Sequence, residues 1–106
     1  MALWRKAGVQ AADLEGKRVI LGITRFAESG SYTQEQHLAR ASIWRHDDYD
    51  FVRFSCEDGE ERVYPFEERF VQRAPKGEYR FRSTGEVVVD PDFLFSVTTY
   101  KGKPPQ

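Results

Sequence analysis

The feature that most constrains the fold is a run of alternating apolar and polar residues from Gln36 to Tyr64. It reads QHLARASIWRHDDYDFVRFSCEDGEERVY, and turn residues break it at Asp47-Asp48 and again at Asp58-Gly59. Short alternating segments joined by Asp-Gly and similar pairs are typical of β-hairpins. The run therefore predicts three consecutive antiparallel strands.

The first turn also predicts which residues face each other. A two-residue turn at Asp47-Asp48 places Trp44 opposite Phe51 and Ala41 opposite Phe54. A shift by one residue would mix the two faces of the hairpin, so the pattern selects this register. One face of the hairpin is then wholly apolar and sets small residues against large ones: Ala39, Ala41, Ile43, Val52, Phe54 and Cys56.

The second turn predicts how the third strand joins this face. A two-residue turn at Asp58-Gly59 places Val63 opposite Phe54 and continues the apolar face. Tyr64 and Arg53 then lie on the outer face, beside the first aromatic pair. Because both turn assignments agree on the core side, each supports the other.

The flanking segments predict further β-structure. Gly16–Phe26 is rich in β-branched residues and predicts a strand, and the polar stretch Ala27–Glu35 predicts a loop. Phe66 and Phe70 are four residues apart, which favours one helical turn with both rings facing inward. Phe93–Tyr100 predicts a last strand.

A further hairpin is predicted in GEYRFRSTGEVVVD. A three-residue loop at 83–85, with Gly85 in a left-handed conformation, suits this segment. This loop places Phe81 opposite Val87 and Tyr79 opposite Val89.

In the order of its elements, the segment Gly16–Phe81 resembles the SH3-like small β-barrel. The resemblance implies an all-β fold with one short helical turn and the last hairpin as a C-terminal extension. It includes no family motif and so carries over no functional residue. A two-sheet β-sandwich is the alternative. We expect a lead-in segment over 1–15, a single β domain over 16–100 and a flexible tail over 101–106.

Composition narrows the class of function. The net charge is −1 and the pI is about 6.1, without the basic excess that a non-specific nucleic-acid binder needs. No apolar run approaches the ~18 residues of a membrane span, and the first residues do not resemble a signal peptide. We therefore expect a cytoplasmic protein. The absence of Asn and the excess of Arg over Lys favour a bacterial source.

No pattern in the sequence predicts catalysis. His37, His46 and Cys56 are candidate metal ligands, but their spacing matches no zinc motif. Cys56 is predicted to be buried, and its acidic neighbours would raise the pKa of its thiol. The sequence also lacks a G-x-S-x-G nucleophile motif. We therefore expect no catalytic residue, metal or cofactor, and a non-enzymatic protein. A small hydrolase or metal enzyme remains an alternative.

The outward aromatic residues favour an interaction module that binds a protein or peptide, since exposed apolar groups of this size mark binding surfaces. A regulatory or toxin-neutralising protein falls in this class. Leu3 and Trp4 of the lead-in segment offer another cover for the same face. The candidate binding residues are Trp44, Phe51, Tyr64, Arg53, Tyr32 and Tyr49, with the loops Ala27–Glu35 and Arg45–Asp50.

Two further partners remain open. The first is RNA, bound by a small barrel through a basic patch of Arg80, Arg82, Arg73 and Lys76. The second is another copy of the chain, because Phe93–Tyr100 could be an edge strand and pair across a homodimer. The same strand could instead close the barrel.

Overall fold

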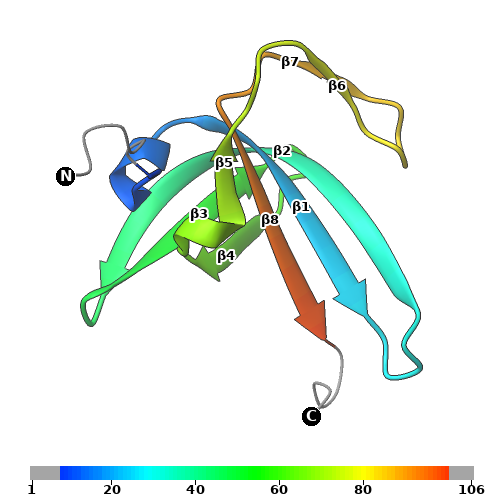
Figure 1. The fold of residues 1–106 in the computed structure, drawn as a ribbon, viewed down its shortest axis with the longest axis horizontal. Helices are drawn as coiled ribbons and strands as arrows, with labels where there is room; N and C mark the ends of the chain where they lie inside the picture. The colour runs from blue at the N-terminus through cyan, green and yellow to red at the C-terminus, as the bar shows by residue number, and fades with distance from the viewer. Residues whose placement is uncertain (1–7, 101–106) are drawn as a thin grey trace, which may run out of the picture.

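A computed structural model describes residues 8–100 of the chain and shows one open, strongly bent sheet with a separate hairpin above it (Figure 1). Six strands form the large sheet in the order β4-β3-β2-β1-β8-β5, and β6 pairs with β7. The strands are β1 (Arg18–Phe26), β2 (Tyr32–His46), β3 (Tyr49–Cys56), β4 (Glu61–Pro65), β5 (Val71–Arg73), β6 (Glu78–Arg80), β7 (Val87–Val89) and β8 (Phe93–Tyr100). Two short 3₁₀ helices accompany them, η1 (Ala11–Leu14) and η2 (Glu68–Phe70).

The all-β prediction is confirmed, but the sheet does not close into an SH3-like barrel. β4 and β5 are the two edges of the large sheet, and in the described residues they do not pair. The cause is β8, which pairs with β1 in parallel from Val19 to Phe26. The last strand thus extends the sheet beyond β1, and β5 pairs with its other side.

β1 is the central strand, and its sequence shows why. Val19, Ile20 and Leu21 are consecutive apolar residues, and all three are buried. Successive side chains of a strand point to opposite faces, so this run requires cover on both faces. We call the face that carries Leu21 the inner face and the face that carries Ile20 the outer face.

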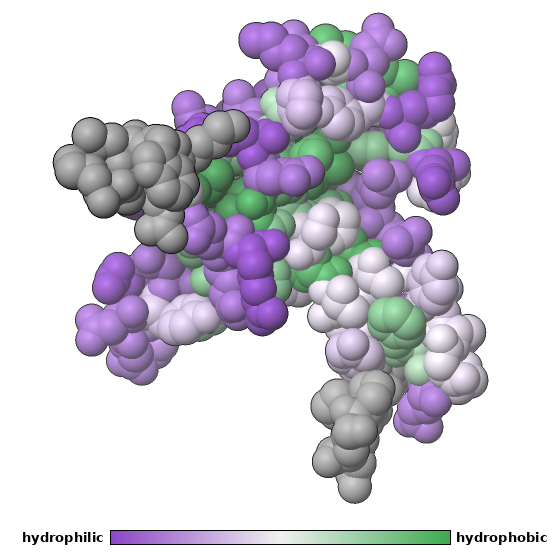
Figure 2. All heavy atoms as spheres, in the orientation of Figure 1, coloured by the Kyte–Doolittle hydropathy of each residue, from purple (hydrophilic) through white to green (hydrophobic). Residues whose placement is uncertain are grey.

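The main core lies on the inner face, where both 3₁₀ helices also pack. Figure 2 shows apolar residues gathered at the centre of the view. Phe54 and Phe95 are fully buried and meet edge to face, with ring centroids 4.9 Å apart. Phe66 and Phe70 pack against this core, as predicted, and η2 forms the helical turn between Pro65 and β5. The small residues Ala39 and Ala41 of β2 lie opposite Cys56 and Phe54 of β3, also as predicted.

The outer face is covered only in part, by the β6–β7 hairpin (Figure 1). Phe81 and Val88 of this region bury Ile20, and Leu38 and Leu94 pack around them. The hairpin therefore protects the end of the sheet where β1 begins.

The predicted register of β2 and β3 is confirmed. Trp44 pairs with Phe51, and Asp47-Asp48 is a two-residue turn. Asp47 and Asp48 have φ of 51° and 62°. Positive φ at both central residues is the geometry that joins two antiparallel strands without splaying them.

The predicted register of β3 and β4 is wrong by one residue. Val63 pairs with Arg53, and Phe54 pairs with Arg62. The loop holds three residues, because Cys56 and Glu60 close it and Gly59 takes the left-handed conformation at its last position, with φ of 90°. Val63 is therefore exposed on the outer face.

The β6–β7 hairpin shows the same error. Tyr79 pairs with Val88, and Phe81 donates its N–H to the carbonyl of Glu86. The loop holds four residues rather than three, although Gly85 does take the predicted left-handed conformation, with φ of 75°. The shift buries Val88 and leaves Val87 and Val89 exposed.

The boundary between the predicted loop Ala27–Glu35 and the strand that follows it also changes. β2 begins at Tyr32, so the predicted loop Ala27–Glu35 shrinks to a short turn, in which Ala27 donates its N–H to the carbonyl of Ser31. Phe93–Tyr100 is the last strand, as predicted, and lies between β1 and β5. Leu3, Trp4 and the tail 101–106 lie outside the described residues.

Leu14 gives a test of this core. The side chain is fully buried on the inner face, although it belongs to the segment predicted as a lead-in. We expect Leu14→Ala to lower the free energy of unfolding by roughly 2–5 kcal/mol, the usual loss for a buried leucine. Urea denaturation measures it, with Lys17→Ala at an exposed position as the control. Equal stability of the two variants would contradict the placement of η1 in the core.

Candidate binding surface

Four aromatic rings gather on the outer face at the end of the β2–β3 hairpin. Trp44 lies with its ring centroid 5.4 Å from that of Phe51 and 5.5 Å from that of His46. Tyr49 lies 5.5 Å from Phe51. We call Trp44, His46, Tyr49 and Phe51 the aromatic surface. It forms because alternate residues of two paired strands share a face next to a tight turn.

The aromatic surface is open. Trp44 and Tyr49 are each 45% exposed. On β4, Pro65 pairs with Phe51, and the exposed Val63 pairs with Arg53, so two more apolar groups flank the surface. This half of the outer face lies away from Ile20, Leu38 and Leu94, which the β6–β7 hairpin covers.

The six predicted binding residues separate into three places. Trp44, Phe51, Tyr49 and Arg53 share the outer face, as predicted. Tyr64 does not join them, because the one-residue correction in β4 turns it to the inner face. There its ring lies 6.4 Å from that of Phe54, and it packs on the core.

Tyr32 lies at the opposite end of β2, in a second aromatic cluster. Its ring is 5.4 Å from Phe26, and Phe26 stacks with Tyr100 at 5.5 Å. An open hollow of about 500 Å³ adjoins these rings. Sequence reasoning found Tyr32 alone, because Tyr100 reaches the cluster only through the parallel pairing of β8 with β1.

The predicted basic patch does not form as one surface. Arg73 lies over the ring of Phe93 and 3.9 Å from Asp13 of η1, on the inner side of the sheet. Arg80 belongs to the hairpin above the outer face, and its guanidinium donates to the carbonyl of Gly85. Lys76 lies in the loop before β6. The sheet thus separates Arg73 from the arginines of the hairpin.

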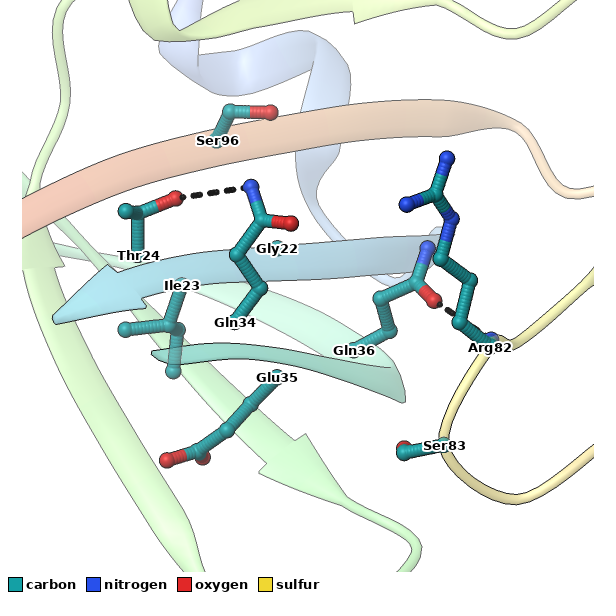
Figure 3. A pocket seen from close by; sticks show the side chains of 9 residues that line it. All are labelled: Gly22, Ile23, Thr24, Gln34, Glu35, Gln36, Arg82, Ser83 and Ser96. Atoms are coloured by element: carbon teal, nitrogen blue, oxygen red, sulfur yellow. Dashed lines mark hydrogen bonds between the residues drawn. The ribbon is translucent and has the colours of Figure 1, made fainter. Parts of the chain in front are cut away.

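A small polar hollow of about 230 Å³ lies between the hairpin loop and the outer face of β1, β2 and β8 (Figure 3). Gln36 accepts a hydrogen bond from the backbone N–H of Arg82 at 3.1 Å, which ties the hairpin loop to β2. Gln34 donates to Thr24 at 3.5 Å. The hollow exists because Gly22 has no side chain and Ser96 has a small one, which leaves space above this part of the sheet.

A row of charged residues crosses the inner face where the core ends. Glu35 accepts a bond from Arg25 at 2.6 Å and lies 3.0 Å from His37. His37 lies 3.7 Å from Asp58, which accepts two bonds from Arg62 at 3.1 and 3.2 Å. The row joins β1, β2 and the β3–β4 loop.

The pKa values follow from these contacts. The hydrogen bonds from Arg25 and His37 lower the pKa of the Glu35 carboxyl to about 2. The bonds from Arg62 and the Glu60 backbone hold the pKa of Asp58 below its usual value. Sequence reasoning missed this row, because it depends on two strand registers and a loop at once.

The three residues considered as metal ligands, His37, His46 and Cys56, contact other parts of the chain. His37 belongs to the charged row, and His46 stacks on Trp44. Cys56 is buried, as predicted, and burial is the largest cause that raises the pKa of its thiol. Within residues 8–100, no three His, Cys, Asp or Glu side chains are arranged to hold a metal ion.

Comparisons of the chain with models of protein families, with curated proteins and with solved structures found no match. Among the described residues, none of the helices has the length and apolar character needed to cross a membrane.

The charged row predicts a pH dependence of stability. The pKa of Glu35 is lower in the folded chain than in the unfolded one, so its stabilising effect is present above pH ~4.5 and is lost as the pH falls toward 2. Solvent reaches the pair with Arg25, so we expect Glu35→Gln to cost about 1 kcal/mol at pH 7. At pH 2.5 the difference from wild type should be much smaller.

Denaturation of both proteins at the two pH values measures this effect. Glu28→Gln, at an exposed loop position, is the matched control and should change stability little at either pH. A loss that is the same at pH 7 and pH 2.5 would show that Glu35 acts through packing rather than through charge.

Proposed function

We propose that this chain is a non-enzymatic interaction module that binds a protein or peptide partner on the aromatic surface of β2 and β3. The observation that carries the proposal is the exposure of Trp44 and Tyr49, 45% each, on a sheet face whose other half is covered by the chain's own hairpin. The chain thus covers Ile20, Leu38 and Leu94 on this face and leaves the aromatic surface open.

The chemistry of the surface suits a protein partner. Large aromatic side chains near the centre of an interface commonly supply most of the binding energy. Polar groups adjoin the rings on the same face, among them Ser42 and Arg53, which pair next to Trp44 and Phe51. An apolar centre with a polar rim is the usual anatomy of a protein interface.

The described part of the N-terminal segment favours a partner over self-cover. Val9 packs against the inner core, and Gly8 lies next to the carboxyl group of Glu68 in η2. Both contacts are on the inner side of the sheet, whereas the aromatic surface is on the outer side. A regulatory or toxin-neutralising protein would use a surface of this kind.

Trp44→Ala tests the proposal. Because the Trp44 ring is nearly half exposed, we expect the variant to lose only about 1 kcal/mol of stability, the typical value of its ring contacts. Binding should weaken far more, by about 2 kcal/mol or roughly 30-fold, if Trp44 is a central contact. Thermal melts measure the first effect. Affinity capture from the source organism, followed by titration of the captured protein, measures the second.

Tyr32→Ala is the matched control, because Tyr32 is an exposed aromatic residue at the other end of β2. It should retain the partner that Trp44→Ala loses. A different result would favour cover of this surface by the N-terminal segment. Trp44→Ala would then lower the free energy of unfolding by about 3–5 kcal/mol, as for a buried tryptophan. Removal of residues 1–7 would cause a similar loss, and the two losses would not add. If the wild type, Trp44→Ala and Tyr32→Ala all captured the same amount of partner, the proposed surface would be contradicted.

A further inference from the structure

β2 is longer than the strand that pairs with it. β2 runs from Tyr32 to His46, but β3 pairs only with Ala39–His46. Over Thr33–His37, β1 is its one strand neighbour among the residues that the structure describes. We call Thr33–His37 the open edge. In Figure 1 this part of β2 forms the outer margin of the sheet on the right.

The hydrogen bonds nearby indicate which backbone groups the open edge presents. Ala41 bonds with Gly16 and Lys17, on the β1 side, whereas the carbonyl of Leu38 accepts from Glu57, on the β3 side. Backbone groups of alternate residues in an antiparallel strand point to opposite edges. The backbone N–H and C=O groups of Gln34 and Gln36 therefore point outward, away from β1, where an added strand could bond to them.

A hollow of about 710 Å³ follows the open edge. One wall is the β3–β4 loop with Glu57 and Asp58, and the other is the β6–β7 hairpin with Ser83 and Thr84 of its loop and Glu86 next to it. The bond between Gln36 and the Arg82 backbone holds this second wall in place. The space is thus bounded by two loops and backed by a strand.

The hollow is acidic. Asp58 is paired with Arg62, and Glu35 with Arg25. Glu57 and Glu86 come from opposite walls, and neither has a basic partner among the ion pairs of the described residues. Both carboxyl groups line the same hollow, and the neighbouring Glu57 carboxyl is the largest cause that raises the pKa of Glu86. A cationic side chain between them would replace this repulsion with attraction.

We propose that the open edge of β2 binds an extended basic segment of a partner protein, which adds to the sheet as a further strand. Backbone bonds to Gln34 and Gln36 supply the affinity, and a Lys or Arg side chain of the segment lies between Glu57 and Glu86. Addition of a strand to an exposed edge is a common mode of peptide recognition. The site is distinct from the aromatic surface, which lies at the other end of β2.

The charges also select against a second copy of the chain. Two open edges placed side by side would bring two acidic hollows together, and like charges across a contact are unfavourable. Charged side chains such as Glu35 on an edge strand likewise limit indiscriminate pairing. A basic segment meets neither obstacle.

Selection of random octapeptides displayed on phage tests the proposal. We expect the protein to select peptides with Lys or Arg at alternate positions. The best peptide, made synthetically, should lose binding when alternate backbone nitrogens are methylated, because methylation removes the donors of a strand. Its binding should slow hydrogen exchange at the Gln34 and Gln36 amides of the protein.

Variants of the protein separate the two surfaces. The double variant Glu57→Gln, Glu86→Gln should bind the peptide about tenfold more weakly. Glu61→Gln, an acidic residue outside the hollow, is the matched control and should bind as wild type does. Trp44→Ala should also bind normally, so failure of the aromatic surface and failure of this site are distinguishable.

Three results would overturn the proposal. The first is selection of peptides without basic residues, or of none. The second is binding that tolerates backbone methylation. The third is self-association in sedimentation experiments with protection of the Gln36 amide, which would assign the open edge to a second copy of the chain.

Discussion

The rest of the structure depends on the enclosure of β1. Val19 and Leu21 lie in the inner core, and Ile20 between them lies under the β6–β7 hairpin. β2 pairs along one edge of β1 and β8 along the other. Consecutive apolar residues are stable in a strand only when both faces are covered. Every other element takes its place from this requirement: β3 and β4 extend from β2, β5 extends from β8, and the hairpin lies above.

The parts of the fold that follow from neighbouring residues could be predicted from the sequence. The turn at Asp47-Asp48 fixes the register of β2 and β3, because the apolar residues beside it allow one pairing. The other hairpins have one more loop residue than predicted. Their registers are ambiguous, because Val63-Tyr64 and Val87–Val89 place an apolar residue on the core face in either register. In addition, a left-handed glycine closes loops of several lengths. The pairing of β8 with β1 is not local, and no pattern in either strand specifies it.

The candidate sites divide in the same way. Trp44 and Phe51 meet across a single local turn, and the sequence predicted their contact. Tyr64 was misplaced by the error in the next turn. The charged row and the open edge require the register of β1 with β2 and the end of β3 to be known together. No local signal in the sequence shows where one strand extends beyond the end of its neighbour. The position of this end depends on the lengths of two segments and on the loop between them.

The contact between Arg18 and Asp92 has a consequence for the order of folding. Arg18 donates its backbone N–H to the Asp92 carboxylate and accepts a bond from the Asp92 backbone, although 74 positions separate the two residues. Contacts between such distant residues form slowly, because a long loop must close first. Until then β1 is an edge strand with unburied apolar residues, open to pairing with other chains. When these two bonds form, β8 is held beside β1, and the period in which the unpaired edge of β1 is open to aggregation ends.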